Sequence, residues 1–197
     1  KPDNKTALSP LYGVHLLYEA GLPAGLFQVV CGEGPDVGPT LIDNADYVMF
    51  TGSTETGRVV GERAARNLIG CCLELGGKNP MIVLPDANLA ETVKGALFGC
   101  YGNTGQICMH IERIYVHESI YDQFKDAFVA ATSSLALGAA YDFEPEVGSL
   151  VSPEHLARVA AHVDDAVAKG ATVLVGGKPR PDLGPAFFEP TVLEGVT

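Results

Sequence analysis

Hydrophobic and polar positions alternate along the first part of the chain in the order helix, strand, helix, strand. Apolar residues at positions 8, 11, 14, 16 and 17 follow the period of an amphipathic helix over residues 7–20, which Gly21 ends. The apolar runs that predict buried strands are Leu26–Cys31, Tyr47–Phe50 and Ile69–Leu75. Between them the pattern predicts a helix after Gly34 and another over Thr54–Arg66.

The same alternation continues through the second part of the chain. The predicted strands are Pro80–Leu84, Arg113–His117 and Ala171–Val175. The predicted helices are Leu89–Tyr101 with Asn88 as its cap, Ser119 to about Leu135, and Pro153–Lys169, while residues 138–152 and 176–190 are expected to be turns and loops. Strands that alternate with helices across short connections predict an α/β fold with doubly wound parallel sheets.

The glycine pair in Gly76-Gly77-Lys78 suggests a boundary between two domains, residues 1–77 and 78–197. The chain opens on Lys1 rather than Met, and its first helix starts almost at once, so we expect it to be a fragment of a longer protein.

The composition excludes several classes of partner. The formal charge is −11 and we find no local Lys/Arg cluster, which disfavours nucleic acid. Five cysteines without a C-x-x-C spacing indicate neither a disulfide framework nor a metal site. No apolar run approaches the length of a membrane helix, so we expect a cytoplasmic protein without a membrane partner.

A strand-to-helix corner at Thr51-Gly52-Ser53-Thr54 is the first candidate for ligand binding. Small residues there leave backbone N–H groups and the helix dipole open to an anion such as a pyrophosphate. The alternative is a tight turn in which Ser53 or Thr54 only caps the helix. The segment Gly32–Gly38 imitates a dinucleotide fingerprint with its last glycine one place late, and we interpret it as a turn.

Glu74 and Cys108 are the candidate base and nucleophile. Glu74 follows an apolar strand, where an acid is costly to bury unless it is paired, for instance with Lys78, or has a pKa suited to base chemistry. Cys108 follows Asn103-Thr104-Gly105-Gln106, a polar bend that would expose the thiol and direct its own N–H toward a bound oxygen. His110 leaves open a Cys–His hydrolase, although in an extended segment it would face away from Cys108. The other thiols in apolar runs, Cys71, Cys72 and Cys100, are expected to lie in the core.

With FTGSTETG, LELGGK and NTGQIC in this order and at these separations, the whole chain resembles the aldehyde dehydrogenase superfamily. The resemblance implies part of the NAD(P)-binding domain followed by much of the catalytic domain. It makes Glu74 the general base and Cys108 the nucleophile that forms a thioester. It also implies cofactor contacts at Thr51, Gly52, Ser53 and Leu75.

Within the superfamily the chain looks most like bacterial succinate-semialdehyde dehydrogenases of the NADP type. The family segment that holds the adenosine ribose matches Lys1, Pro2 and Asn4. Many NAD-preferring members have an acid where this chain has Asn4, so NADP is the expected cofactor and NAD is possible. Some relatives place a carboxylate-binding Arg where this chain has Gly102.

The resemblance further implies a small aldehyde as substrate and a homodimer or homotetramer at full length. It also implies that an upstream Asn and a downstream Glu of the family's site lie outside these residues, so that the isolated piece could be inactive. A coenzyme A-acylating dehydrogenase and an inactive nucleotide-binding fragment are the alternatives.

Overall fold

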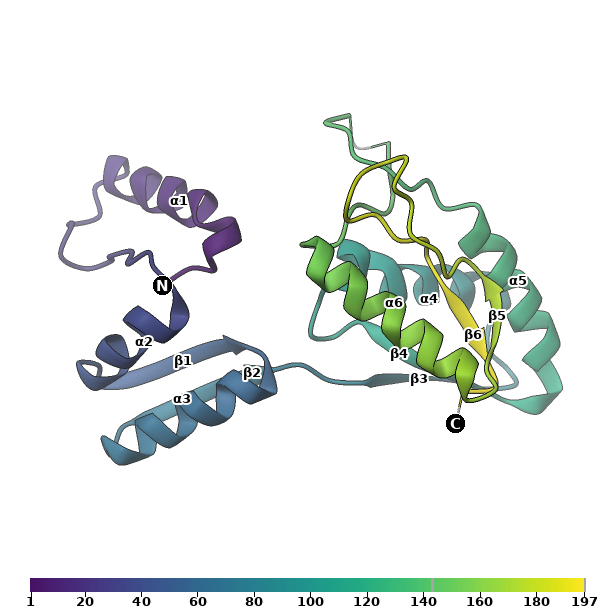
Figure 1. Cartoon of the computed structure of the whole chain (residues 1–197), viewed down its shortest axis with the longest axis horizontal. Helices are drawn as coiled ribbons and strands as arrows, with labels where there is room; N and C mark the ends of the chain where they lie inside the picture. Colours follow the sequence, from purple (N-terminus) through teal and green to yellow (C-terminus); the bar gives the residue numbers. More distant parts are fainter. Residues whose placement is uncertain (143, 197) are drawn as a thin grey trace. The chain divides into compact units, whose positions relative to one another are not determined.

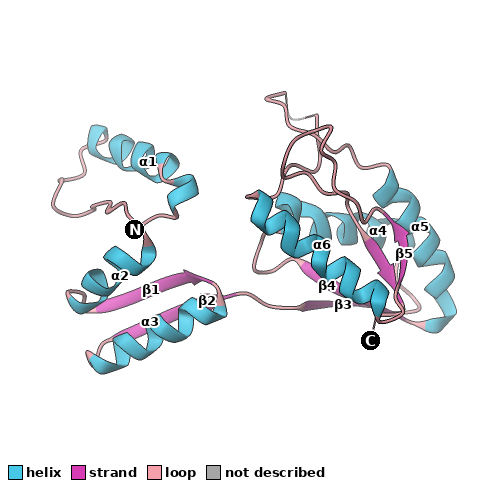
Figure 2. Cartoon of the chain, in the orientation of Figure 1, coloured by secondary structure: helices cyan, strands magenta, loops and turns pink. Residues whose placement is uncertain are grey.

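The computed structural model describes residues 1–142 and 144–196 and has the expected α/β class with parallel strands. The chain forms two compact units, Lys1–Gly76 and the part from Gly77 onward (Figure 1). Each unit carries its own strands and helices (Figure 2).

The first unit is built around a parallel β-α-β element. Strand β1 (Tyr47–Gly52) pairs in parallel with β2 (Gly70–Leu75), and helix α3 (Thr54–Arg66) connects them. The register runs from Tyr47 opposite Gly70 to Gly52 opposite Leu75, so both strands end at the same edge. The remaining elements of this unit are the 3-10 turn η1 (Asn4–Thr6), α1 (Leu8–Glu19) and α2 (Gly34–Asp43).

Helix α3 packs closely on one face of this strand pair. A Cβ atom added to Gly57 would lie 2.5 Å from a side-chain carbon of Leu75, and one added to Gly61 would lie 3.2 Å from Leu73. Leu73 and Leu75 therefore face the helix. Because side chains alternate along a strand, Glu74 lies on the opposite face of β2.

The predicted strand Leu26–Cys31 is wrong: these residues form a turn followed by an irregular segment. Leu26, Phe27 and Val30 are all exposed. A strand needs a neighbour for its backbone hydrogen bonds, and in the described residues of this unit only β1 and β2 pair.

The second unit contains a parallel pair and an antiparallel pair of strands. Strand β3 (Asn79–Val83) pairs in parallel with β4 (Ile111–Val116), and α4 (Leu89–Tyr101) and the 3-10 turn η2 (Gly102–Gly105) lie between them in sequence. Strand β5 (Thr172–Val175) pairs with β6 (Val192–Glu194) in antiparallel orientation, which departs from the all-parallel expectation. The other elements are η3 (Glu118–Ile120), α5 (Tyr121–Ser133) and α6 (Pro153–Ala168).

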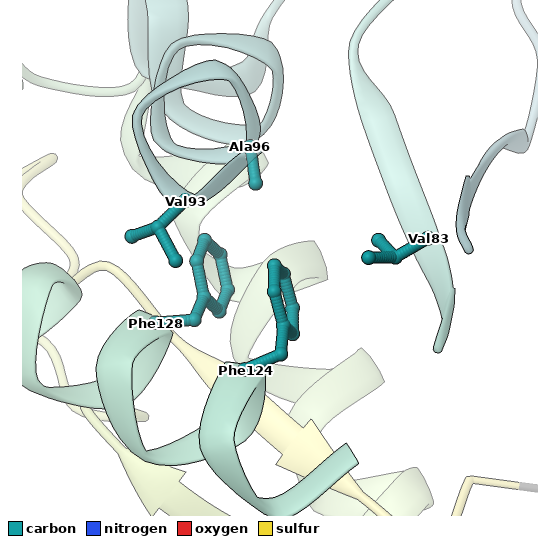
Figure 3. Packing of buried hydrophobic residues seen from close by; sticks show 5 residues of the cluster. All are labelled: Val83, Val93, Ala96, Phe124 and Phe128. Atoms are coloured by element: carbon teal, nitrogen blue, oxygen red, sulfur yellow. The ribbon is translucent and has the colours of Figure 1, made fainter. Parts of the chain in front are cut away.

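The main core of this unit joins α4, α5 and β3. Phe124 and Phe128 of α5 stack with ring centroids 5.6 Å apart, and Figure 3 shows them beside Val93 and Ala96 of α4, with Val83 of β3 on the other side. All five residues are at least nine-tenths buried. This cluster fixes α4, the helix that leads into the Cys108 loop.

Helix boundaries follow their capping residues. Asn88 accepts a hydrogen bond from the Glu91 amide at 3.2 Å, and Ser152 accepts one from the His155 amide at 3.2 Å, which sets the starts of α4 and α6. The predicted helix over 119–135 is divided into η3 and α5. Within the described part of the chain, no helix is both long and apolar enough to cross a bilayer.

Candidate active site

The corner after β1 serves as a helix cap. The Ser53 hydroxyl accepts a hydrogen bond from the Thr56 amide at 3.1 Å, so Ser53 is the N-cap of α3, as the simpler interpretation of this corner expected. Thr51, Gly52 and Ser53 are all exposed. The amides of the first turn of α3 have no acceptor within the helix, so the corner remains able to meet an anion.

Glu74 lies beside this corner. The strand register places Glu74 opposite Thr51 and Leu75 opposite Gly52. Glu74 is exposed, so it does not bear the cost of burial that an acid at the end of an apolar strand can carry, and its carboxylate lies 3.8 Å from the Cys72 thiol. The alternative partner, Lys78, forms an ion pair with Glu112. The first unit therefore brings together Thr51, Gly52, Ser53, Glu74 and Leu75 at the carboxyl ends of two parallel strands.

The segment at Lys1 is organised by short-range polar contacts. The Lys1 ammonium donates to the Asn4 side-chain oxygen at 3.2 Å. The carboxylate of Asp3 accepts from the Lys5 amide at 2.9 Å and caps η1. The nearest acid is thus engaged with the backbone, while Lys1 and Asn4 stay exposed and Pro2 is half-buried.

In the second unit, Cys108 follows a run of left-handed backbone. Asn103, Thr104 and Gly105 have φ of 50°, 59° and 69°. Left-handed geometry is common for Gly and Asn but strained for a β-branched residue such as Thr104. This run ends α4 and turns the chain into the Cys108 segment.

Two side chains tether this strained run to the segment 148–151. The Thr104 hydroxyl accepts from the Gly148 amide at 3.2 Å. The Gln106 carboxamide accepts from the Val151 amide at 2.8 Å and donates to the Ser149 carbonyl at 3.3 Å. These contacts offset the strain and hold the approach to Cys108 in place.

Cys108 itself lies at the second position of a β-turn. The His110 amide donates to the Ile107 carbonyl at 3.1 Å, which closes the turn over Cys108 and Met109. The extended geometry considered for His110 is therefore not what the structure has, since residues 107–110 form a turn. Cys108 is exposed. The Asn79 side-chain amide donates to the carbonyls of Cys108 at 2.7 Å and His110 at 3.0 Å.

The other thiols differ from Cys108 in their surroundings. Cys71 is exposed and not in the core as expected, because an apolar run does not reveal which face of a strand is covered. Cys72 and Cys100 are half-buried, and all five thiols are free. Cys100 lines a cleft of about 550 Å³ in the second unit, and burial raises the pKa of its thiol to about 11. Cys100 is therefore a neutral thiol at physiological pH.

Two residues around the turn, Asn79 and Glu112, were missed in the sequence analysis, and the side chain of Lys78 was considered there only as a partner of Glu74. Asn79 directly follows the recognised Gly-Gly-Lys segment, but its amide could equally have faced solvent. In the described residues, no group of three or more His, Cys, Asp or Glu side chains is arranged to hold a metal ion.

Known proteins match this chain over its full length. The aldehyde dehydrogenase family matches residues 1–197. This chain belongs to the aldehyde dehydrogenase family. It is 53% identical over 197 residues to a Mycolicibacterium smegmatis protein named "Putative succinate-semialdehyde dehydrogenase [NADP(+)]", in a match that covers all of this chain and 38% of that protein. It is 42% identical to the glutarate-semialdehyde dehydrogenase of Pseudomonas aeruginosa, covering 41% of that protein.

Solved aldehyde dehydrogenases share the fold. The crystal structure of succinate-semialdehyde dehydrogenase from Burkholderia pseudomallei matches all of this chain with a TM-score of 0.95 and 39% identity, and this chain covers 41% of it. A betaine aldehyde dehydrogenase from Staphylococcus aureus in complex with NAD+ matches 95% of this chain with a TM-score of 0.89, at 38% identity and 38% coverage of that structure. This aldehyde dehydrogenase chain thus spans about two fifths of the length of these relatives.

Proposed function

We propose that the enzyme containing this chain oxidises an aldehyde to the carboxylic acid with NADP+ through a thioester on Cys108. The observation that carries the proposal is the exposed Cys108 on a tethered turn, in a chain that matches the aldehyde dehydrogenase family from end to end. The two units correspond in this proposal to the cofactor-binding part, residues 1–77, and the catalytic part, residues 78–197.

The corner after β1 fits the cofactor. Small exposed residues, Thr51 to Ser53, precede a 13-residue helix whose first amides are directed to the corner, and a pyrophosphate needs such donors. We assign cofactor contact to these residues and to Leu75, whose side chain lies along α3 at Gly57. When bound, NADP+ accepts the hydride that leaves the substrate carbon.

NADP is favoured over NAD by the segment at Lys1. A 2′-phosphate needs positive charge and no opposing carboxylate. Lys1 provides the positive charge and Asn4 is neutral, while the neighbouring Asp3 carboxylate accepts a hydrogen bond from the Lys5 amide and is thereby directed to the backbone. The Mycolicibacterium smegmatis relative carries NADP(+) in its name. Equal or better turnover with NAD+ would contradict this preference.

In the proposed reaction the Cys108 thiolate attacks the aldehyde carbon, and the Cys108 N–H donates to the oxygen that becomes negative. Expulsion of the hydride leaves the acyl group on the sulfur as a thioester. Glu74 then removes a proton from water, the resulting hydroxide attacks the thioester, and the acid and the thiolate are released. The exposed carboxylate of Glu74 suits this role because it can accept a proton from solvent water.

Succinate semialdehyde is the proposed substrate, because proteins named for this activity or for a semialdehyde one carbon longer are among the relatives. Recognition of its distal carboxylate must use a group other than position 102, which is Gly102 here. A coenzyme A requirement for turnover would instead favour the acylating alternative, against which the presence of Glu74 argues.

The deciding experiment follows NADPH formation in the full-length enzyme. Cys108→Ala should abolish NADPH production, whereas Glu74→Gln should keep the initial burst and slow the steady state. Cys31→Ala, which removes another exposed free thiol, is the matched control and should leave both phases unchanged. Loss of the burst in Glu74→Gln would show that Glu74 acts before hydride transfer.

A second test compares the thiols directly. Cys108 should be alkylated by iodoacetamide faster than the other four, and Cys100 slowest at pH 8 because its neutral thiol is not the nucleophilic form. Fastest reaction at Cys31 or Cys71 would argue for an idle nucleotide-binding fragment.

We further propose a cytoplasmic enzyme that assembles as a homodimer or homotetramer and has neither nucleic acid nor membrane as a partner. The free thiols and the acidic charge support this setting. Light scattering on the full-length protein tests the assembly, and a monomeric mass would contradict it.

A further inference from the structure

The turn that presents Cys108 is controlled by one carbonyl group, that of Ile107. Its oxygen accepts the His110 amide at 3.1 Å and the His110 ring nitrogen Nδ1 at 2.7 Å. Because a carbonyl oxygen can only accept, Nδ1 carries the proton in this contact. His110 therefore holds the Ile107 carbonyl with two donors.

This carbonyl belongs to the same peptide group as the Cys108 N–H. A trans peptide is planar, and its C=O and N–H point in opposite directions. Fixing the Ile107 oxygen therefore fixes the direction of the Cys108 N–H. A donor on the carbonyl also polarises the amide, which makes its N–H a better donor.

The second nitrogen of the His110 ring contacts a carboxylate. Its Nε2 lies 3.0 Å from a Glu112 carboxylate oxygen, and the other oxygen of Glu112 pairs with Lys78. The His110 and Glu112 side chains are 23% and 24% exposed, so this contact is shielded more than a surface ion pair. Both ring nitrogens face acceptors, and an imidazolium ring can donate to both.

A register shift in the sheet makes this contact possible. Asn79 pairs with Ile111 but Pro80 pairs with Arg113, so Glu112 is an extra residue on β4. Such bulges redirect side chains near functional sites. Here Glu112 reaches both His110 on its own chain segment and Lys78, the residue before β3.

We propose that His110 is a positioning residue of the oxyanion site: through the Ile107 carbonyl it aligns the Cys108 N–H, and Glu112 with Lys78 fixes its ring. This inference rests on the proposed thioester chemistry. It also assigns His110 a role other than that of a base, because Nδ1 is committed to a carbonyl and Nε2 to a carboxylate.

The test uses three substitutions of His110 in the full-length enzyme. His110→Asn keeps a donor near the position of Nδ1, whereas His110→Gln places its amide near Nε2 and His110→Ala has none. The matched control is His15→Ala, since His15 is also paired with a glutamate, Glu19, at 3.3 Å but is exposed.

Two rates are measured: the NADPH burst and the alkylation of Cys108 by iodoacetamide, a reaction that forms no oxyanion. We expect the burst rate to fall about 10- to 100-fold in His110→Ala and His110→Gln, less than the loss of an oxyanion donor itself. His110→Asn should recover most of that loss. Alkylation should change by less than about threefold in all variants, because the thiol itself is untouched.

Several outcomes overturn the inference. A burst rate unchanged in His110→Ala, or equally low in His110→Asn, removes the alignment role. Alkylation that falls in parallel with the burst shows that His110 supports the thiolate or the whole turn instead. A full-length unsubstituted enzyme that forms no NADPH from any aldehyde refutes the proposed function first, and this is recognised before any variant is compared.

Discussion

Asn79 offers a sharp test of how the nucleophile turn is held, because its side chain must donate and not accept. Its NH₂ group faces two acceptors, the carbonyls of Cys108 and His110, at 2.7 and 3.0 Å. The bond to Cys108 is exposed, so water can replace it in an Asn79→Ala variant. The bond to His110 is partly buried, and its loss leaves a carbonyl poorly solvated.

The two losses together amount to about 1.5–2.5 kcal/mol of local stability, with about 0.5–1 from the exposed bond and about 1–1.5 from the other. Opening of the turn should then become about 10- to 60-fold more frequent, since about 1.4 kcal/mol corresponds to a factor of ten. Asn79→Asp should open the turn further still, because a carboxylate there would face two carbonyl oxygens.

Hydrogen exchange of the peptide that includes the His110 amide measures this opening, since that amide closes the turn. The matched control is Asn88→Asp. Asn88 accepts from the Glu91 amide, a role that a carboxylate performs as well, so exchange at the turn and at the start of α4 should not increase. Faster exchange in Asn79→Ala than in Asn79→Asp, or no change in either, would refute the reasoning.

Three further predictions concern the rest of the molecule. Phe128→Ala should lower the free energy of unfolding by about 3–5 kcal/mol, whereas Phe98→Ala, at an 81% exposed position, should cost less than about 1 kcal/mol in the same denaturant titration. A hydrogen bond from Arg63 lowers the pKa of Asp43 from 3.8 to about 2. The stability that this pair provides is therefore present above pH 3.8, the pKa of Asp43 in the unfolded chain, and is lost as the pH falls toward 2. Melting temperatures between about pH 5 and 2 should therefore fall more steeply than in Asp43→Asn, and parallel curves would contradict this. Gly102→Arg should lower the KM for succinate semialdehyde but not for an uncharged aldehyde. The side chain can be accommodated, because a Cβ at this position meets only the Phe98 side chain, at 3.8 Å. An equal effect on both substrates would exclude recognition of the carboxylate.

Local signals in the sequence were enough to place most helices and strands. Residues Thr54–Arg66 and Leu89–Tyr101 form helices with the predicted bounds, because capping residues and periodic apolar positions define their ends. The run Leu26–Cys31 was misassigned because its apolar pattern carries no information about a partner strand. Strand β6 was missed because it is only three residues long and forms through pairing with β5, which is distant in the sequence.

The sequence points to the candidate catalytic residues of the site, but not to the side chains that hold the Cys108 turn. Cys108 and Glu74 stand out in the sequence, and their roles remain proposals. The contacts of Asn79 and Glu112 depend on a one-residue bulge and on left-handed backbone at Thr104, neither of which leaves a pattern in the sequence. Such features arise from tertiary contacts, which local propensities do not encode.

The tethers of the left-handed run have a consequence for the order of folding. Thr104 and Gln106 are held by amides 44 and 45 residues further along the chain. During synthesis, the segment that carries the nucleophile emerges well before its supports, and it can be ordered only after residues 148–151 have left the ribosome and docked. We therefore expect the reactive geometry to be among the last parts of this unit to form, so that a nascent chain carries an unorganised thiol rather than an active one.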